Sequence, residues 1–387
     1  MNFSYNEDQQ SIQDVAVRMF RDLCGDDTIR TLYQAEQPLH RELWQQVAQS
    51  GLLGTALPAA VGGSDMGMTE LCLLLEQQGK SVAPIPVLES IVEAALPIAR
   101  FGSQDLQQTL LPGVISGETI LSAVRPYQGL QAHTPLTATA QPASQANGGE
   151  EHWVLNGYSN LVGYAHFAQG FLVTATLADG GYWVGYVDAG SAGLHITSQR
   201  ATNGEASGHI RFDQVTVPAH NLMATHSEAE TLLQWQRQHT FAAMAALQLG
   251  VLHEGLRRAA EYTTERTQFG KPLAAFQAVS QQAADGYMAI EALRGVYWRL
   301  LDILDQGAAD DLETNLTAHS VKYWVCESGH IAAHIFLHLH GGIGQDLDYP
   351  VHRFFSWAKK NETYLGGADQ QAAQLGRLIQ SNPAALV

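Results

Sequence analysis

The sequence predicts an α+β fold in which helices form both ends of the chain and strands form its middle. Three observations support this. Between residues 1 and 118, apolar residues recur at three- and four-residue steps, as one buried helix face requires. Between 119 and 222 the pattern changes to short runs rich in β-branched and aromatic residues. From 223 to 387 the helical spacing returns and continues to the end.

The first segment, 1–118, is expected to be a helical domain. Polar residues 6–10 open its first helix, and the apolar stripe of a second helix lies around Trp44. Residues 57–63 contain a proline and two glycines, so they form a loop that cannot be helical throughout. We expect a helix at 68–79 and then, at 80–90, a connector stiffened by its prolines.

The middle segment, 119–222, is expected to be a small β domain. Its β-rich runs are at 153–155, 171–175, 182–187 and 209–212. The Asp-Gly-Gly sequence at 179–181 predicts a turn between two of them, and 141–149 is expected to be a polar loop. After Val217 and Pro218 the chain is expected to return to helix and remain helical, which makes 223–387 a third domain.

The composition excludes several classes of protein. A net charge of -17 argues against nucleic-acid binding, because a phosphate backbone requires a basic face. The three cysteines and sixteen histidines show no metal-ligand spacing, so we predict no metal site and expect buried thiols in a reducing compartment. The first residues are not a signal peptide and no apolar run approaches membrane length, so a cytoplasmic protein without a membrane partner is expected.

The stretch 265–285 interrupts the C-terminal helical pattern. The pattern breaks at Gly270 and Pro272 and resumes from Phe276, which places Arg266, Gln268 and Phe269 at the corner of a helical hairpin. A cation beside an aromatic ring suits a flat, anionic ligand. On spacing alone, however, the favoured interpretation is a surface arginine and a phenylalanine that plugs the corner.

Two motifs carry a resemblance to a known family. Arg266-x-x-Phe269-Gly270-Lys271 followed by Phe276-Gln277, and the distant His340-Gly341-Gly342-x-Gly344, resemble the acyl-CoA dehydrogenase family. The similarity covers nearly the whole chain, in the family's order. It implies a helical domain, a β domain and a C-terminal four-helix bundle that builds a tetramer. It also implies FAD as cofactor, an acyl-CoA substrate, and electron-transfer flavoprotein or another electron acceptor.

The resemblance also assigns residues to the cofactor. In the family, the arginine and phenylalanine lie against the pyrophosphate and flavin of an FAD held by the neighbouring subunit, and the Gly-Gly segment approaches its adenosine. Glycine permits such a close approach of backbone to ligand. The residues thereby predicted to bind FAD are Arg266, Gln268, Phe269, Phe276, Gln277, His338, Gly341 and Gly342. Of these, His338 departs from the family's usual glutamine but can still form hydrogen bonds.

The catalytic base of the family is absent from its usual position. The family places a glutamate, followed by glycine and threonine, near its C-terminus, whereas this chain has Leu365 and Gly367 at the first and third positions. Some members carry the base on the helix before the arginine corner, where this chain has Thr240, a poor proton acceptor. Glu362 and Asp369 are nearby, and both are expected to be solvated surface carboxylates. We therefore predict no catalytic residue in this chain.

The segments that hold the flavin ring within one subunit are also altered. Residues 122–129 lack the Gly-Ala-Gly-Ser sequence of the family's first β-domain loop. In the second contact, at 156–164, Leu161 replaces the aromatic residue that stacks on the flavin, and Gly163 replaces the residue whose hydroxyl lies beside it. The chain thus keeps the residues that a subunit offers to its neighbour's FAD and loses those for its own.

This asymmetry predicts a non-catalytic partner in a heteromeric acyl-CoA dehydrogenase, with two copies of each chain and a paralogous subunit that carries the glutamate. Residues 80–90 resemble a segment of bacterial members that act on bulky, steroid-derived acyl-CoAs. One alternative is a self-sufficient homotetramer with a displaced base such as Glu362. The other is a non-enzymatic acyl-CoA-binding scaffold, with Lys359-Lys360 or Arg257-Arg258 as candidate cations.

Overall fold

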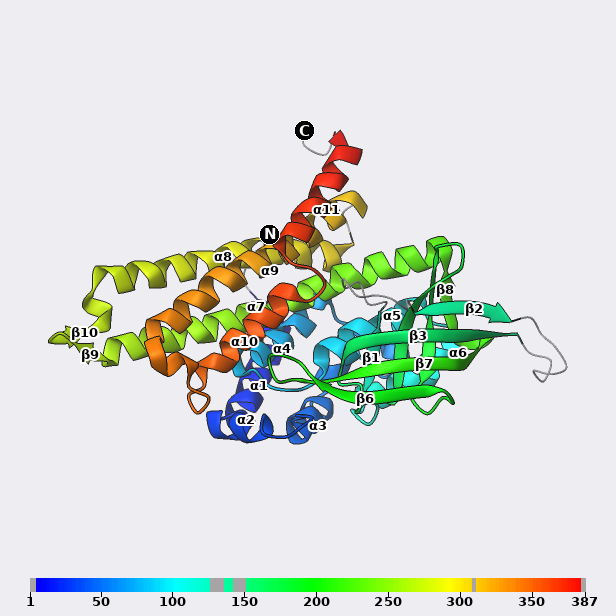
Figure 1. The fold of residues 1–387 in the computed structure, drawn as a ribbon, viewed down its shortest axis with the longest axis horizontal. Helices are drawn as coiled ribbons and strands as arrows, with labels where there is room; N and C mark the ends of the chain where they lie inside the picture. The colour runs from blue at the N-terminus through cyan, green and yellow to red at the C-terminus, as the bar shows by residue number, and fades with distance from the viewer. Residues whose placement is uncertain (1–4, 126–135, 142–150, 308–310, 384–387) are drawn as a thin grey trace. The chain divides into compact units, whose positions relative to one another are not determined.

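The computed structural model describes residues 5–125, 136–141, 151–307 and 311–383 (Figure 1). The chain divides into two compact units. The helical unit comprises Met1–Gln34, Gly67–Ala83 and Gln238–Val387, and the sheet unit comprises Ala35–Met66 and Pro84–Arg237. Each unit is built from segments distant in sequence. The division into three domains at 118 and 222 stays a prediction.

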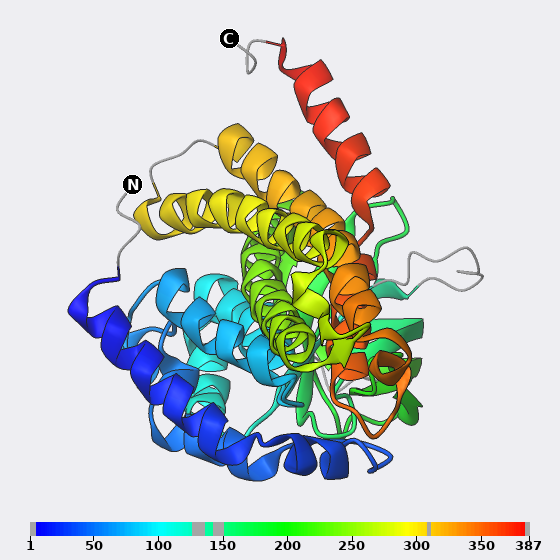
Figure 2. The same ribbon diagram turned by 90° about the vertical axis from the view of Figure 1, so that its left-hand side faces the viewer.

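The helical unit contains long helices that pack side by side, as Figures 1 and 2 show for α7, α8 and α9. Its helices are α1 (Glu7–Leu23), α2 (Asp26–Leu32), α4 (Met68–Ser81), most of α7 (His226–Glu265), α8 (Gln277–Gln306), α9 (Asp311–His340), α10 (Val351–Thr363) and α11 (Ala368–Ser381). The helix α1 begins where the sequence predicts, because Asn6 accepts a hydrogen bond from the Gln9 backbone N–H at 2.8 Å. The Asn6 backbone N–H in turn donates to the Gln9 side chain, which completes a capping box.

Two glycines allow α4 and α7 to cross closely. A Cβ at Gly79 would collide with the backbone of Leu247, and a Cβ at Gly250 would collide with the backbone of Glu76. A side chain at either position would therefore force the two helices apart. This crossing fixes α7, whose far end carries the predicted FAD-binding corner.

The corner itself has the predicted form. The helix α7 ends at Glu265, the short strands β9 (Thr267–Gln268) and β10 (Lys271–Pro272) pair with each other, and α8 begins at Gln277. Figure 1 shows β9 and β10 at the tip where α7 and α8 meet. Phe269 and Gly270 make the turn in left-handed backbone conformations, with φ of 52° and 80°. The prediction of a helical hairpin that breaks at Gly270 and Pro272 is confirmed.

The sheet unit is built around one eight-stranded sheet. Its strands are β1 (Leu121–Val124), β2 (Thr137–Gln141), β3 (His152–Gly163), β4 (Gly170–Thr176), β5 (Tyr182–Asp188), β6 (Leu194–Arg200), β7 (Ala206–Pro218) and β8 (Leu222–Thr225). The order is β6-β7-β3-β2-β4-β5-β8, and β1 pairs in parallel with β4. All four β-rich runs lie in strands, and 179–181 separates β4 from β5 as a turn. Residues 142–150, which include most of the expected polar loop, lie outside the described residues.

The expectation that the chain returns to helix directly after Pro218 was wrong. A 3-10 turn, Ala219–Asn221, leads into β8, which pairs antiparallel with β5 before α7 begins. The four residues of β8 are too few for the alternation of a strand to be recognised in the sequence. The pairing with β5 supplies the hydrogen bonds that decide their conformation.

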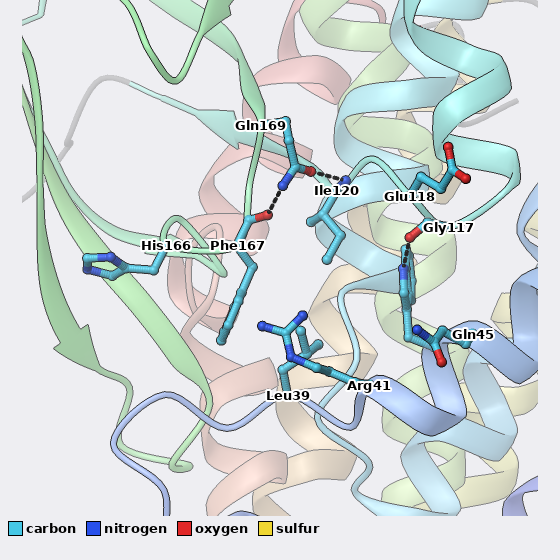
Figure 3. A pocket seen from close by; sticks show the side chains of 10 residues that line it. Leu39, Arg41, Gln45, Gly117, Glu118, Ile120, His166, Phe167 and Gln169 are labelled. Carbon is cyan, nitrogen blue, oxygen red and sulfur yellow. Dashed lines mark hydrogen bonds between the residues drawn. The ribbon is translucent and has the colours of Figure 1, made fainter.

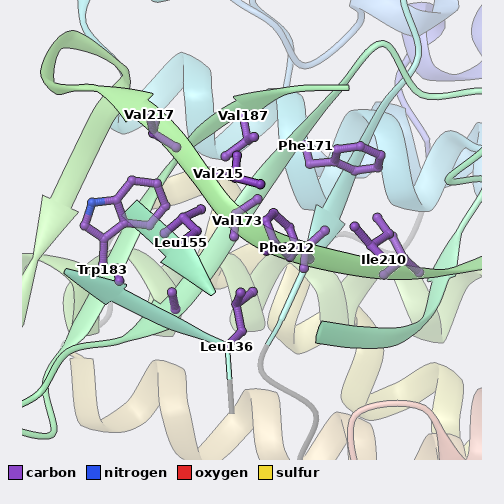
Figure 4. Close-up of a cluster of buried hydrophobic side chains, with 14 of the residues drawn as sticks. Leu136, Leu155, Phe171, Val173, Trp183, Val187, Ile210, Phe212, Val215 and Val217 are labelled. Carbon is purple, nitrogen blue, oxygen red and sulfur yellow. The ribbon is translucent and has the colours of Figure 1, made fainter. Parts of the chain in front are cut away.

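The core of the sheet unit lies on one face of this sheet (Figure 4). Trp183 and Phe171 are fully buried there beside Leu155 from β3 and Val215 from β7. Buried and exposed residues alternate in the second half of β7, as expected where one face is solvated, whereas β4 is buried at all but its last residue, as expected where both faces are covered.

The segment at 80–90 was expected to be a connector, and this holds for only part of it. The helix α4 extends to Ser81, and a π-helix, Val87–Ala95, begins before the segment ends. It is followed by α5 (Leu96–Phe101) and α6 (Gln104–Ile115), while α3 (Arg41–Gln49) precedes it in the same unit. Every residue of the π-helix is buried. π-Helical turns are rare and are frequently found at functional sites.

Within the described residues, none of the helices is both long enough and apolar enough to span a membrane.

Candidate functional site

The residues at the corner between α7 and α8 are almost entirely exposed. Phe269 is 92% exposed, and its ring meets the edge of the Phe276 ring, at 6.3 Å between ring centroids. The Arg266 side chain makes no hydrogen bond or ion pair with any residue that the structure describes. The Gln268 side chain donates to the carbonyl oxygen of its neighbour, Thr267. With respect to the described part of the chain, the corner therefore offers an unpaired guanidinium and an uncovered ring to an outside ligand.

The backbone holds these side chains in place. The Leu273 N–H donates to the Arg266 carbonyl oxygen at 2.9 Å, which closes the turn. The Lys271 ammonium lies 4.1 Å from the centre of the Phe276 ring and donates to the Ala275 carbonyl oxygen at 3.3 Å. The corner is thus a structured turn, even though its side chains are exposed to solvent.

The predicted residues at the end of α9 lie at the same end of the helical unit. The ring of His340 stacks on that of Tyr262 in α7 at 4.9 Å, and His338 Nδ1 lies 3.1 Å from Gln282 Oε1 in α8. Gly341 and Gly342 are exposed, and a Cβ built on either would meet nothing within 4 Å. The structure therefore brings all eight predicted FAD-binding residues to the end of the unit where α7 stops, α8 starts and α9 stops.

His340 itself is a buried group to which the sequence analysis assigned no role of its own. Its Nδ1 donates to the Phe336 carbonyl oxygen at 2.7 Å, while its Nε2 is buried without a hydrogen-bond partner among the described residues. Burial lowers the pKa of this imidazole below its usual value. It therefore stays neutral at neutral pH.

The loop at the usual position of the base contains no proton acceptor at that position. Leu365 adopts a left-handed conformation with φ of 57°, which is unfavourable for a residue other than glycine. The Gln371 side chain donates to the Leu365 carbonyl oxygen at 3.1 Å and to that of Gly366 at 3.3 Å, and fixes the loop. A loop of defined geometry is thus retained where the family carries its base, but it holds a leucine.

A buried lysine lies beneath this loop, and the sequence analysis missed it. Lys322 is fully buried and donates to the carbonyl oxygens of Asn361 at 3.0 Å and Glu362 at 3.1 Å, in the last turn of α10. It satisfies acceptors that the end of a helix leaves free. Burial lowers its pKa. The signal in the sequence was no more than a lysine among apolar residues of a helix.

The three residues considered as displaced bases differ in their surroundings. Thr240 is fully buried in α7, and Asp369 is exposed in the first turn of α11, as expected. The expectation for Glu362 was wrong: its side chain is only 20% exposed, is ion-paired with Lys359 and lies 3.4 Å from His330. The Glu362 carboxylate is thus engaged by Lys359 and lies close to His330, instead of standing free in solvent.

The segments expected to hold a flavin within this subunit lie together in the sheet unit. The Ser122 hydroxyl in β1 donates to the Gly163 carbonyl oxygen in β3 at 2.7 Å. Leu161 lies within an irregularity in the pairing of β3 with β7, between Ser159 and Val162, has a φ of 55° and is 56% exposed. Residues 126–129 of the first segment lie outside the described residues. Leu161 offers no aromatic ring to stack on a flavin, and Gly163 offers no hydroxyl beside it.

A cavity of about 210 Å³ also lies in the sheet unit (Figure 3). The Arg41 guanidinium on its wall lies 5.2 Å from the centre of the Phe167 ring, and Trp44 Nε1 donates to the Gly117 carbonyl oxygen at 3.0 Å. None of the predicted site residues lines it. The described residues contain no group of three or more His, Cys, Asp or Glu side chains that could hold a metal ion.

Comparison with known proteins identifies the family. The chain matches the N-terminal domain of acyl-CoA dehydrogenases over residues 6–118 and their C-terminal domain over 229–380. The acyl-CoA dehydrogenase FadE27 of Mycobacterium tuberculosis is 34% identical over 388 aligned residues, which cover 99% of this chain and 100% of that protein. The chain belongs to the acyl-CoA dehydrogenase family. Acyl-CoA dehydrogenases are FAD-dependent oxidoreductases that act on CH–CH bonds, so the predicted fold and cofactor are confirmed.

Two solved structures of family members are similar over the full length. A chain of a variant of the Tcur3481-Tcur3483 steroid ACAD is 36% identical, with 98% of this chain and 99% of that chain covered and a TM-score of 0.87. A chain of the ChsE4-ChsE5 complex from Mycobacterium tuberculosis is 33% identical, with 99% of each chain covered and a TM-score of 0.88. The name of each of these two solved structures joins two proteins, Tcur3481 with Tcur3483 and ChsE4 with ChsE5.

The residues of this acyl-CoA dehydrogenase fit FAD at one place and not at another. At the end of the helical unit, an arginine fork, an exposed ring and two open glycines are groups that can meet a pyrophosphate, a flavin and an adenosine. In the sheet unit the space beside Gly163 is already filled by a protein side chain.

Proposed function

We propose that this chain is the non-catalytic subunit of a heteromeric acyl-CoA dehydrogenase. It completes the FAD site of a glutamate-bearing paralogous subunit through the exposed corner between α7 and α8 and through the glycines after α9. A tetramer with two copies of each chain is the assembly that the proposal implies.

The observation that carries the proposal is the contrast between the two sets of residues. Phe269 is 92% exposed and stands beside a guanidinium without a partner among the described residues. This pair is unusual on a folded surface and calls for a second surface to cover it. In contrast, Leu365 stands in an ordered loop where a proton acceptor is needed. The similarity to a chain of ChsE4-ChsE5 adds support, because that structure is a complex.

In this account the bound FAD supplies the hydride acceptor, and the partner's glutamate removes the proton next to the thioester. The present chain contributes binding and orientation. The Arg266 fork would offer paired donors to the phosphate oxygens of FAD, and the Phe269 ring would shield the flavin from water. The Gly341 and Gly342 backbone allows the adenosine to approach closely. Electron-transfer flavoprotein or another acceptor would reoxidise the complex.

For the substrate, we propose a bulky acyl-CoA of steroid origin. The support is the 36% identity to a chain of a steroid ACAD. Turnover by the reconstituted complex should be higher with a steroid side-chain CoA thioester than with butyryl-CoA. Equal or greater activity with butyryl-CoA would contradict the substrate assignment but not the subunit role.

The substitution Arg266→Ala tests the subunit role. Loss of a charge-assisted, bidentate contact should cost the complex about 1.5–3 kcal/mol of FAD binding, or roughly ten- to hundredfold in affinity. Flavin per polypeptide after gel filtration is the measurement. Arg21→Ala is the control, because Arg21 is exposed on α1 and pairs only with Asp22 among the described residues. Unchanged flavin retention in Arg266→Ala would refute the role.

A further inference from the structure

The space beside Gly163 is filled by Glu89. A Cβ built on Gly163 would lie 2.7 Å from Glu89 Cγ and 3.0 Å from Glu89 Oε1. Real side chains do not pack at such distances, so no residue larger than glycine fits at 163 while Glu89 keeps its position. Glu89 is 6% exposed, which means that a buried carboxyl group lies against β3 where the family carries a hydroxyl residue.

The π-helix Val87–Ala95 sets the position of Glu89. The Ser90 hydroxyl in this helix accepts a bond from the Leu121 backbone N–H at 3.0 Å, which ties the helix to β1. One turn further along, Glu93 is 1% exposed and pairs with Arg125 at 3.1 Å. The Arg125 carbonyl oxygen in turn accepts from the Ser159 hydroxyl in β3 at 2.8 Å. The segment that carries Glu89 is therefore tied to the sheet at two positions directly after this residue.

We propose that Glu89 keeps FAD out of this subunit's own flavin cleft. The inference rests on the proposed function, since it explains why the chain offers residues to its partner's cofactor but holds none itself. Leu161 and Gly163 alone would give a weakened site. Glu89 makes it a closed one.

Two physical effects act together. The first is volume, because the side chain occupies the place beside the Gly163 backbone that a flavin ring and a small hydroxyl residue would share. The second is polarity, because a flavin ring at this place would lie against the buried Glu89 carboxyl group. A buried carboxyl group that loses its contacts is unfavourable.

The experiment uses the full chain purified alone, mixed with excess FAD and passed through gel filtration. The double variant Glu89→Ala/Gly163→Thr should retain FAD, whereas the wild-type chain should elute colourless. A double variant with an unchanged circular dichroism spectrum that also elutes colourless would overturn the proposal. The Arg266→Ala test measures the loss of FAD from the partner's site in the complex, whereas the present test measures FAD binding by this chain alone. The two proposals can therefore fail independently.

A second measurement covers the case in which the double variant does not fold. Gly163→Ala should destabilise the wild-type chain, with an unfolding midpoint lowered by several degrees, because the new methyl group meets Glu89. The same substitution should be close to neutral in the Glu89→Ala background. An equal shift in both backgrounds would show that Glu89 does not fill this space, and the proposal would be rejected.

Discussion

Phe269 offers the clearest quantitative prediction. Its ring is 92% exposed in this chain and meets only the edge of Phe276 among the described residues. Burial of a phenylalanine side chain contributes about 1.5–3 kcal/mol, and nearly all of that contribution is still available for association. The substitution Phe269→Ala should therefore weaken FAD retention by the complex roughly ten- to hundredfold.

The same substitution should hardly change the isolated chain. Exposed positions without buried partners usually alter stability by less than about 0.5 kcal/mol. Alanine keeps the cost of the left-handed backbone at 269, so no relief of strain offsets the lost ring. The paired assays are urea unfolding of the chain alone and the rate of flavin release from the complex, followed by flavin fluorescence.

Leu161→Ala is the matched control, because Leu161 is also an exposed apolar residue, 56% exposed, but belongs to the altered cleft of the sheet unit. It should leave flavin release unchanged. The reasoning is refuted if Phe269→Ala destabilises the isolated chain by more than about 1 kcal/mol while flavin release stays at the wild-type rate. That result would mean that Phe269 plugs the corner, the plainer interpretation of its spacing.

Three further predictions concern buried polar groups. Lys322→Met should lower the free energy of unfolding by about 2–3 kcal/mol in urea titration, because the Asn361 carbonyl oxygen at the end of α10 loses its lysine donor and that of Glu362 keeps only the weak Cys326 thiol donor. Arg125→Met should lower the free energy of unfolding by about 3–5 kcal/mol in the same titration, because it removes the cation that pairs with the buried Glu93 carboxylate. The double variant Arg125→Met/Glu93→Gln should recover most of that stability, because no carboxylate is then left without its cation. Burial lowers the folded-state pKa of His340, so below its ordinary value of 6.5 the unfolded state takes up a proton that the folded state does not. Stability should therefore fall as the pH drops from 6.5 to the folded-state pKa of His340 and stop falling below that pKa. In the His340→Gln variant, the unfolding temperature should depend less steeply on pH across this range.

The α7–α8 corner shows what local sequence preferences can predict. Gly270 and Pro272 each have a strong local preference against helix, and the structure places the turn there. The exposure of Phe269 could not be predicted, because a ring that packs into the corner and a ring that points into solvent have the same spacing in the sequence. That distinction depends on what packs against the ring in the folded protein, which local spacing does not specify.

The sheet unit shows what local sequence preferences cannot predict. Gly163 is a visible departure from the family, but the side chain that fills the vacated space comes from Glu89, more than seventy positions earlier. Within its own segment Glu89 follows two prolines, which indicated only a connector. Neither the π-helix nor the contact with β3 has a local signature, because both result from packing against β1.

The measurement that tests the central claim most directly is the visible absorption spectrum of the chain, purified alone and again after co-expression with a glutamate-bearing paralogue, with flavin counted per polypeptide. The account predicts a colourless chain alone and a yellow complex. A full flavin band from the chain by itself would contradict it, because the cleft beside Glu89 and Gly163 would then hold its own FAD.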